Sequence, residues 1–247
     1  MAEWIKADVI ENKRWGKDLF SLILDAKVNP FIAGQFTKLG LEIDGKLIQR
    51  AYSFVNPPDS KYQEIHITRI QDGLLSPRLH ALKSGDQILI TKTSTGHFTL
   101  NEIPRGQQLW MIATGTAIGP FLSILRQNSA WTRFRKIILI HGVRFSADLS
   151  YQGEINKLAQ QYQDQFIVQP FVTREPNTHA LSGRITHAIK DGMLERIVGV
   201  RFNQQQSQVM LCGNPNMVKE VQGLLLARGL QKNLRAKPGN ITVERYW

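Results

Sequence analysis

The sequence predicts a two-domain protein, in which an N-terminal antiparallel β-barrel is followed by an α/β domain built on a doubly wound parallel sheet. The chain has 247 residues, of which 42% are hydrophobic, enough for two separate cores. The pattern of predicted secondary structure changes near residue 101, from short extended runs between turn signals to apolar strands that alternate with amphipathic helices. We therefore expect a barrel domain at residues 1–100 and an α/β domain at residues 101–247.

The first half is predicted to contain several short strands and one helix. The extended runs lie at residues 19–24, 36–43, 51–55, 64–70 and 87–91. Turn signals such as Asp44-Gly45 and Asp72-Gly73 separate them. A short helix fits residues 76–82, with Ser76 as the N-cap and Pro77 at the first helical position. This punctuation is typical of a small antiparallel barrel.

The second half is predicted to alternate strands and helices. Strands are expected at residues 108–113, 136–141, 165–171 and 208–211, and helices at 120–127, 149–162 and 216–226. In a parallel sheet, ligands bind beyond the carboxyl ends of the strands. The loops at those ends span residues 114–120, 142–144, 173–175 and 212–215. The loops at 114–120 and 212–215 are small and glycine-bearing, and the other two carry an arginine, so that together they outline a cleft for an anionic ligand.

Composition favours an anionic partner and a reducing environment. The net charge is +11, but the basic residues are spread along the chain without an RNA-binding signature, so a nucleic-acid reader is disfavoured. One cysteine excludes an internal disulfide and any multi-cysteine metal site, and the histidines show no metal spacing. The N-terminus lacks the apolar centre of a signal peptide, and the uncharged stretch at 106–125 contains Gly115, Gly119 and Pro120. We expect a cytoplasmic protein that does not insert into membranes.

The most informative motif is Arg50-Ala51-Tyr52-Ser53, which places a cation, an aromatic ring and a hydroxyl within a few residues of extended chain. Arg50 suits a forked contact with a diphosphate, and Tyr52 offers a flat surface for a ring. The combination indicates a phosphorylated aromatic cofactor, although an ordinary half-exposed strand gives the same alternation. Tyr52 and Ser53 point to opposite faces of a regular strand, so a cofactor that uses both must bind at the strand end.

The loop that follows the strand at 108–113 is suited to phosphate, because its free amides open a helix. It is neither a Walker loop nor a G-x-G-x-x-G, since Ala117 stands where the second glycine would be. Where an NAD site would place an acid, this chain has Arg144, with Arg174 and Arg184 further on. These arginines favour NADP over NAD, although solvated surface arginines remain an alternative.

With these motifs in this order, the chain resembles the ferredoxin–NADP reductases, and most closely the bacterial flavodoxin/ferredoxin–NADP reductase branch. The resemblance runs from Trp4 to Trp247. It rests on Arg50-Ala51-Tyr52-Ser53, on the loop at 115–120, on residues 212–217 and on the ending Glu244-Arg245-Tyr246-Trp247. It implies an FAD-binding barrel followed by an NADP-binding α/β domain, with a C-terminal tail that returns to the flavin.

The resemblance also implies which residues form the sites. FAD would be held by Arg50, Ala51, Tyr52, Ser53, His66, Ile67, Thr68, Leu74, Leu75, Ser76, Thr116, Tyr246 and Trp247. NADP would meet Thr116, Arg144, Thr173, Arg174, Arg184 and Cys212. The residues implied in hydride transfer are Ser53, Cys212, Glu244 and Tyr246. Taken alone, Cys212 could equally be a packing residue and Glu244 a surface acid.

The predicted function is electron transfer between NADP(H) and an acidic ferredoxin or flavodoxin, by a monomeric FAD enzyme. The cofactor supplies the chemistry and the protein positions it. Two rival functions remain open from the sequence. One is an NAD(P)H-dependent flavin reductase or the reductase component of an oxygenase, which shares the same modules. The other is a basic protein that binds nucleic acid or a membrane surface without redox activity.

Overall fold

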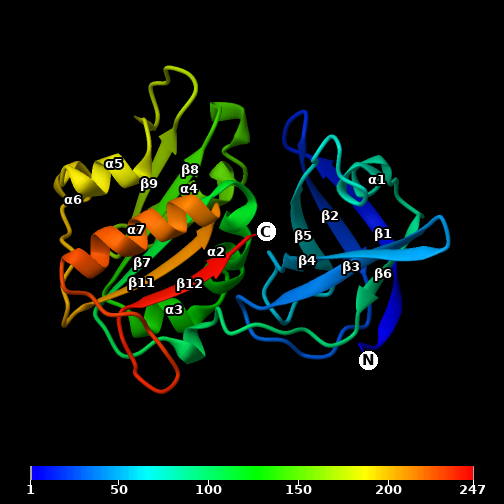
Figure 1. Cartoon of the computed structure of the whole chain (residues 1–247), viewed down its shortest axis with the longest axis horizontal. Helices are drawn as coiled ribbons and strands as arrows, with labels where there is room; N and C mark the ends of the chain where they lie inside the picture. Colours follow the sequence, from blue (N-terminus) through cyan, green and yellow to red (C-terminus); the bar gives the residue numbers. More distant parts are fainter. Residues whose placement is uncertain (1, 247) are drawn as a thin grey trace. The chain divides into compact units, whose positions relative to one another are not determined.

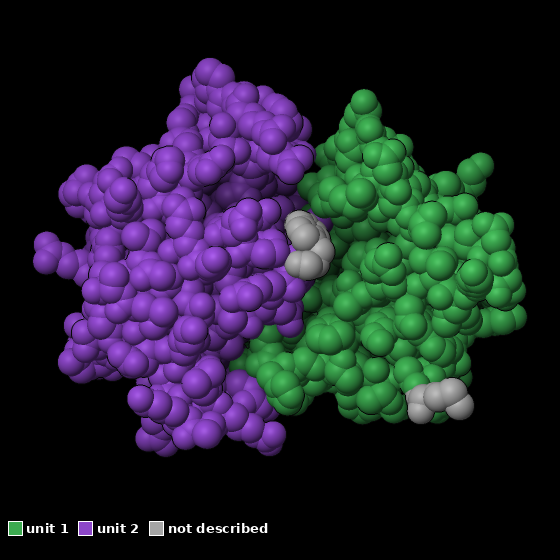
Figure 2. All heavy atoms as spheres, in the orientation of Figure 1, with its two compact units in different colours: residues 1–99, 119–127 green, residues 100–118, 128–247 purple. Residues whose placement is uncertain are grey.

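The computed structural model describes residues 2–246, which form two compact units. Unit 1 comprises residues 1–99 and 119–127, and unit 2 comprises residues 100–118 and 128–247 (Figure 2). The segment 119–127 follows the first strand of unit 2 in the sequence, yet it clusters with unit 1.

Unit 1 is built on a six-stranded antiparallel sheet with the order β4-β3-β6-β1-β2-β5. The strands are β1 (Trp4–Arg14), β2 (Leu19–Asp25), β3 (Phe36–Ile43), β4 (Lys46–Ser53), β5 (Gln63–Thr68) and β6 (Gln87–Thr91). The edge strands β4 and β5 approach each other where Phe54, just after β4, bridges to Ile65. A core that includes Phe20, Leu22 and Leu39 fills the inside of this half-barrel. The predicted antiparallel barrel is confirmed.

Strand β1 was missing from the prediction, although its first half carries a short hydrophobic alternation. Of its eleven residues only Ala7 and Val9 are buried, although the strand pairs with both β2 and β6. A register shift between Val9 and Glu11 bends it as it passes from one partner to the other. Ile5, Ala7 and Val9 alternate with polar residues, and backbone pairing on both edges stabilises the more polar remainder of the strand.

The short helix α1 (Ser76–Ala81) lies where it was expected, but Ser76 is not its N-cap. The N-cap is Leu75 and Ser76 is the first helical residue, so Pro77 is the second helical residue rather than the first. The Ser76 hydroxyl instead accepts a hydrogen bond from the Ile70 amide at 2.9 Å. A serine before proline is a good sequence signal for a cap, but here the side chain closes the preceding loop.

Unit 2 is built on a parallel sheet with the order β10-β9-β8-β7-β11-β12 (Figure 1). The strands are β7 (Gln108–Thr114), β8 (Lys136–Val143), β9 (Phe166–Val172), β10 (Leu181–Ser182), β11 (Ser207–Gly213) and β12 (Ile241–Arg245). The helices are α2 (Ile118–Leu125), α3 (Asn128–Arg133), α4 (Gln152–Gln161), α5 (Ile185–Lys190), α6 (Met193–Val198) and α7 (Pro215–Ala227), with short 3-10 turns at Leu100–Glu102, Gly115–Ala117 and Ser146–Asp148. The predicted α/β fold is confirmed.

One face of this sheet is covered by α5, α6 and α7. Their side chains share one core with residues of β7, β8, β9 and β11, among them Ile138 and Ile140 of β8. Because strand side chains alternate, Leu139 and His141 of β8 point to the opposite face. Within residues 2–246 no helix is long and apolar enough to cross a bilayer, and the uncharged stretch at 106–125 folds mainly as β7, a 3-10 turn and α2.

Candidate cofactor and nucleotide sites

The predicted cofactor motif lies at the point where the chain changes strand partner. Strand β4 pairs with β3 up to Ser53, which stands opposite Phe36. The next residue, Phe54, bridges to β5, and the Val55 amide donates to the Glu64 carbonyl at 2.8 Å. Regular pairing with β3 therefore ends immediately after Ser53. A strand end of this kind is where a ligand could reach side chains of both faces, although the Ser53 side of the strand is buried here.

Arg50 and Tyr52 provide a cation beside an aromatic ring. Arg50 is exposed, and its guanidinium donates to the Gln49 carbonyl at 2.7 Å. Tyr52 is half-buried against the barrel core, and this burial raises the pKa of Tyr52 to about 12, an effect that the positive charge of Arg50 partly opposes. That electrostatic coupling fits two side chains on one strand face. An exposed guanidinium next to a neutral ring fits the diphosphate and ring system of FAD.

The three site residues predicted on β5 differ in what they can offer a ligand. Ile67 packs in the barrel core. The His66 ring is buried, with Nδ1 3.0 Å from the Ser21 hydroxyl, and it contacts the Trp15 ring edge-on. Thr68 is partly exposed. A ligand along this strand would meet the side chain of Thr68 and the backbone of the other two.

The loop before α1 is ordered by short-range contacts. The Gly73 amide donates to the Ile70 carbonyl at 2.9 Å, and a Cβ at Gly73 would lie 3.1 Å from that oxygen, which favours glycine in the turn. The Arg78 guanidinium donates to the Leu74 carbonyl at 2.7 Å. The side chain of Leu75 is buried in the core while that of Leu74 is 56% exposed. Residues 74–76 thus enter the helix from a fixed turn.

Sequence reasoning missed a polar cluster that holds the chain just after the motif. Arg126 donates to the Val55 carbonyl at 2.9 Å and forms a 2.7 Å ion pair with Glu64. The side-chain oxygen of Asn56 accepts from the Glu64 amide at 2.7 Å, and the Ser123 hydroxyl donates to the Asn56 carbonyl at 2.7 Å. All these residues belong to unit 1. No local motif could have revealed the contacts of Arg126 and Ser123, whose partners lie more than 60 residues away in the sequence.

In unit 2, the loop after β7 leaves open space above its backbone. Gly115 has φ +57°, and apart from Gly115 and its two chain neighbours, no heavy atom of residues 2–246 lies within 4 Å of the position that a Cβ would occupy there. Thr116 follows in the 3-10 turn Gly115–Ala117, with its side chain 7% exposed. Open backbone at the start of a helix fits an anionic ligand.

The three predicted arginines follow the carboxyl ends of the neighbouring strands β8, β9 and β10. The Arg174 amide donates to the Arg144 carbonyl at 2.9 Å, and Thr173 donates through both its amide and its hydroxyl to the Val143 carbonyl, each at 3.1 Å. Arg184 follows β10, whose Ser182 pairs with Val172. All three arginine side chains are exposed. Their shared position on β8, β9 and β10 suits a phosphate group.

Cys212, Glu244 and Tyr246 come together at the other end of the same edge. Cys212 stands opposite Glu244 in the β11–β12 pairing, with Sγ 3.9 Å from Oε1, and the Tyr246 amide donates to the Gly213 carbonyl at 3.1 Å. Burial, followed by the negative charge of Glu244, holds the pKa of the Cys212 thiol well above its usual range. The thiol is therefore protonated and donates to the carboxylate. Trp247 lies outside the described residues, and Ser53 belongs to unit 1.

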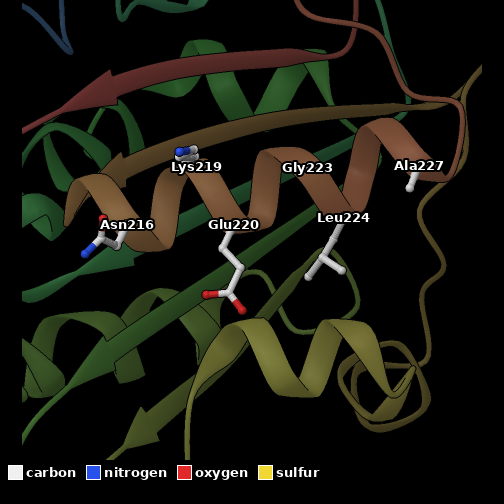
Figure 3. Close-up of a pocket in the computed structure, with 6 residues that line it drawn as sticks. All are labelled: Asn216, Lys219, Glu220, Gly223, Leu224 and Ala227. Atoms are coloured by element: carbon white, nitrogen blue, oxygen red, sulfur yellow. The ribbon is translucent and has the colours of Figure 1, made fainter.

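A separate open groove of about 430 Å³ runs along the outer side of α7 (Figure 3). It contains none of the predicted site residues. The residues that line it are Asn216, Lys219, Glu220, Gly223, Leu224 and Ala227.

Comparisons with known proteins match both units. Residues 7–100 match the oxidoreductase FAD-binding domain, and residues 111–223 match the oxidoreductase NAD-binding domain. Fold and site thus define an oxidoreductase that binds FAD and a nicotinamide nucleotide. The chain is 47% identical over 248 residues to the flavodoxin/ferredoxin–NADP reductase of Escherichia coli (strain K12), covering 100% of both chains. It belongs to the flavodoxin/ferredoxin–NADP reductase family, as the sequence motifs predicted.

Two further relatives agree with this assignment. The ferredoxin–NADP reductase of Pseudomonas aeruginosa is 34% identical over 249 residues, with 96% of this chain and 95% of the relative covered. A crystal structure of a ferredoxin NADP+ reductase from Neisseria gonorrhoeae with bound FAD and NADP aligns with a TM-score of 0.94 and 32% identity, over 99% of both chains. The domain matches and this related structure confirm the predicted cofactors, FAD and NADP. The individual site residues stay predictions.

Proposed function

We propose that the chain is an FAD-dependent reductase that moves electrons between NADP(H) and a small acidic one-electron carrier, either ferredoxin or flavodoxin. The carboxyl edge of the unit 2 sheet carries this proposal, with exposed arginines at one end and, at the other, the buried Cys212 beside the half-buried Glu244. Between β9 and β11 lie three strand spacings, roughly 14 Å at about 4.8 Å each. One extended dinucleotide along this edge would reach both ends.

For NADP(H), each end of the edge has its own task. Arg144, Arg174 and Arg184 would hold the 2′-phosphate, and Thr173 would support the loop that carries Arg174. Thr116 and Cys212 would meet the nicotinamide end, where the small loop at Gly115 lets a ring approach the backbone.

For FAD, the motif at the end of β4 supplies the main contacts. Arg50 would pair with the diphosphate, Tyr52 would stack on the ring system, and Ser53 would donate to a ring nitrogen. The amides of Leu74, Leu75 and Ser76 would hold the second side of the diphosphate. The remaining FAD residues are assigned through the family resemblance: Ala51, His66, Ile67, Thr68, Thr116, Tyr246 and Trp247.

In hydride transfer the protein orients groups and controls protons. When bound, FAD supplies the exchange between hydride and single-electron chemistry. The Cys212 thiol, protonated because it is buried beside Glu244, would keep that carboxylate fixed. Ser53 is 6% exposed, so its hydroxyl would act in a largely dry environment where a hydrogen bond counts for more. Tyr246 would cover the ring.

The remaining assignments follow the same proposal. Residues 1–100 would bind FAD, and residues 101–247 would bind NADP(H) and send the C-terminal tail to the flavin. The net charge of +11 favours an acidic carrier over nucleic acid, given the absence of an RNA-binding motif. We infer a monomeric, cytoplasmic enzyme.

An absorbance experiment tests this proposal. The purified protein should show flavin bands, and these should bleach with NADPH far more readily than with NADH. A colourless protein that binds no added FAD would contradict it. Flavin that dissociates readily and is reduced only when free would instead favour a flavin reductase.

A further inference from the structure

His141 is a polar side chain in an apolar strand, and the proposed function gives it no role. It lies near the carboxyl end of β8, where residues 137–143 are all buried, and its own side chain is 1% exposed. Central strands of parallel sheets usually consist of Val, Ile and Leu. A buried imidazole costs free energy of folding unless it is hydrogen-bonded.

The hydrogen bond of His141 fixes its tautomer. Nε2 lies 2.9 Å from the Gly115 carbonyl oxygen, and a carbonyl only accepts, so Nε2 carries the proton. Burial lowers the pKa of His141 to about 4, an effect that the bond to Gly115 partly offsets, so the ring is neutral at pH 7. Its lone pair is then on Nδ1, which is buried and has no hydrogen-bond partner among the described residues.

The carbonyl that His141 holds belongs to the loop of the proposed NADP site. The Gly115 oxygen also accepts from the Ile118 amide, which closes the 3-10 turn containing Thr116. On the other side of β7, the Asn214 amide donates to the Thr114 hydroxyl at 2.9 Å. The segment 114–116 is therefore held from β11 by Asn214 and from β8 by His141.

We propose that His141 is a positioning residue for hydride transfer, whose Nε2–H fixes the Gly115 carbonyl and thereby the place of Thr116. This inference rests on the proposed function, because only that function gives Thr116 a task. His141 itself contacts neither reacting group. Its single neutral tautomer suits this role, because the Gly115 carbonyl requires a proton on Nε2.

Nitrogen-15 NMR of the histidine rings tests the tautomer without any turnover. We expect the His141 ring to remain neutral with its proton on Nε2 between pH 5.5 and 8. A proton on Nδ1, or a ring that titrates near pH 6.5, would overturn the proposal.

Three variants test the positioning role. His141→Leu keeps the bulk but removes the donor, His141→Gln keeps an amide donor at similar reach, and Leu139→Val perturbs the same face of β8 two residues earlier. We expect His141→Leu to slow flavin reduction by NADPH about tenfold, the scale of one well-placed hydrogen bond, with a smaller change in KM. His141→Gln should recover most of this loss. Leu139→Val should lower thermal stability without a comparable loss of rate.

The outcomes separate this proposal from the proposed function. Wild-type flavin that NADPH fails to reduce would refute the proposed function. An active wild type with an equally fast His141→Leu would refute the positioning role alone. The positioning role would also be refuted if flavin reduction slowed equally in the Leu and Gln variants, in proportion to their loss of stability. If His141→Leu does not fold, the Gln variant and the NMR result still decide. A His141 proton on Nδ1 contradicts the proposal, and so does a wild-type rate in a Gln variant whose amide does not reach the Gly115 carbonyl.

Discussion

At the level of single residues, burial sets the charge of the side chains that shape the sites. Burial and Glu244 keep the Cys212 thiol protonated, burial keeps the His141 imidazole neutral, and burial raises the pKa of Tyr52 to about 12. The arginines at the ends of β8 and β9, in contrast, are exposed and charged. We therefore expect the exposed arginines to bind anions, and the buried side chains to keep neighbouring groups in position.

Replacement of Arg174 and Arg184 together by alanine should reduce the preference for NADPH over NADH. Each substitution would remove a charge-assisted contact with the 2′-phosphate. The energy of that contact is reduced by solvent screening because both side chains are exposed. We expect kcat/KM for NADPH to fall roughly 10- to 100-fold, and the value for NADH to change little. Arg196→Ala, an exposed arginine on α6, serves as the matched control. An unchanged preference for NADPH would show that these arginines do not read the phosphate.

At the level of elements, the sequence predicted strands well where the hydrophobic pattern is local. Residues 36–43 and 87–91 were predicted as strands and form β3 and β6. β1 and β12 were not predicted, because the more polar part of β1 and the short edge strand β12 depend on pairing with distant segments. Ser76 shows the same limit, since its hydroxyl bonds to Ile70 rather than to the helix it opens.

Two glycines near β11 and α7 should respond oppositely to alanine. At Gly213, with φ +124°, a Cβ would lie 2.2 Å from the Thr114 hydroxyl oxygen. Gly213→Ala should therefore lower the free energy of unfolding by about 2 kcal/mol or more. Gly223 lies inside α7, with no heavy atom within 4 Å of such a Cβ among the described residues. Gly223→Ala should raise the free energy of unfolding by about 0.5–1 kcal/mol. Urea titrations measure both, and equal stabilities would contradict the assignment of Gly213 to a close contact.

At the level of the whole molecule, the change in the pattern of predicted secondary structure near residue 101 was enough to predict the fold class. Motifs such as Arg50-Ala51-Tyr52-Ser53 indicated the candidate site, because the cation, the ring and the hydroxyl lie close together in the sequence. The polar cluster of Arg126, Glu64 and Asn56 could not be predicted, since its members meet only through folding. For the same reason, no sequence pattern indicated that residues 119–127 would cluster with the barrel unit.

The central claim is that electrons from NADPH reach an acidic carrier protein through this flavoenzyme. The most direct measurement is the steady-state reduction of ferredoxin or flavodoxin by NADPH over a range of ionic strength, with ferricyanide as a small acceptor for comparison. With a net charge of +11, we expect carrier reduction to slow as salt screens the encounter, while the ferricyanide reaction shows that turnover itself persists. NADPH oxidation with ferricyanide but with neither carrier, at any salt concentration, would contradict the account.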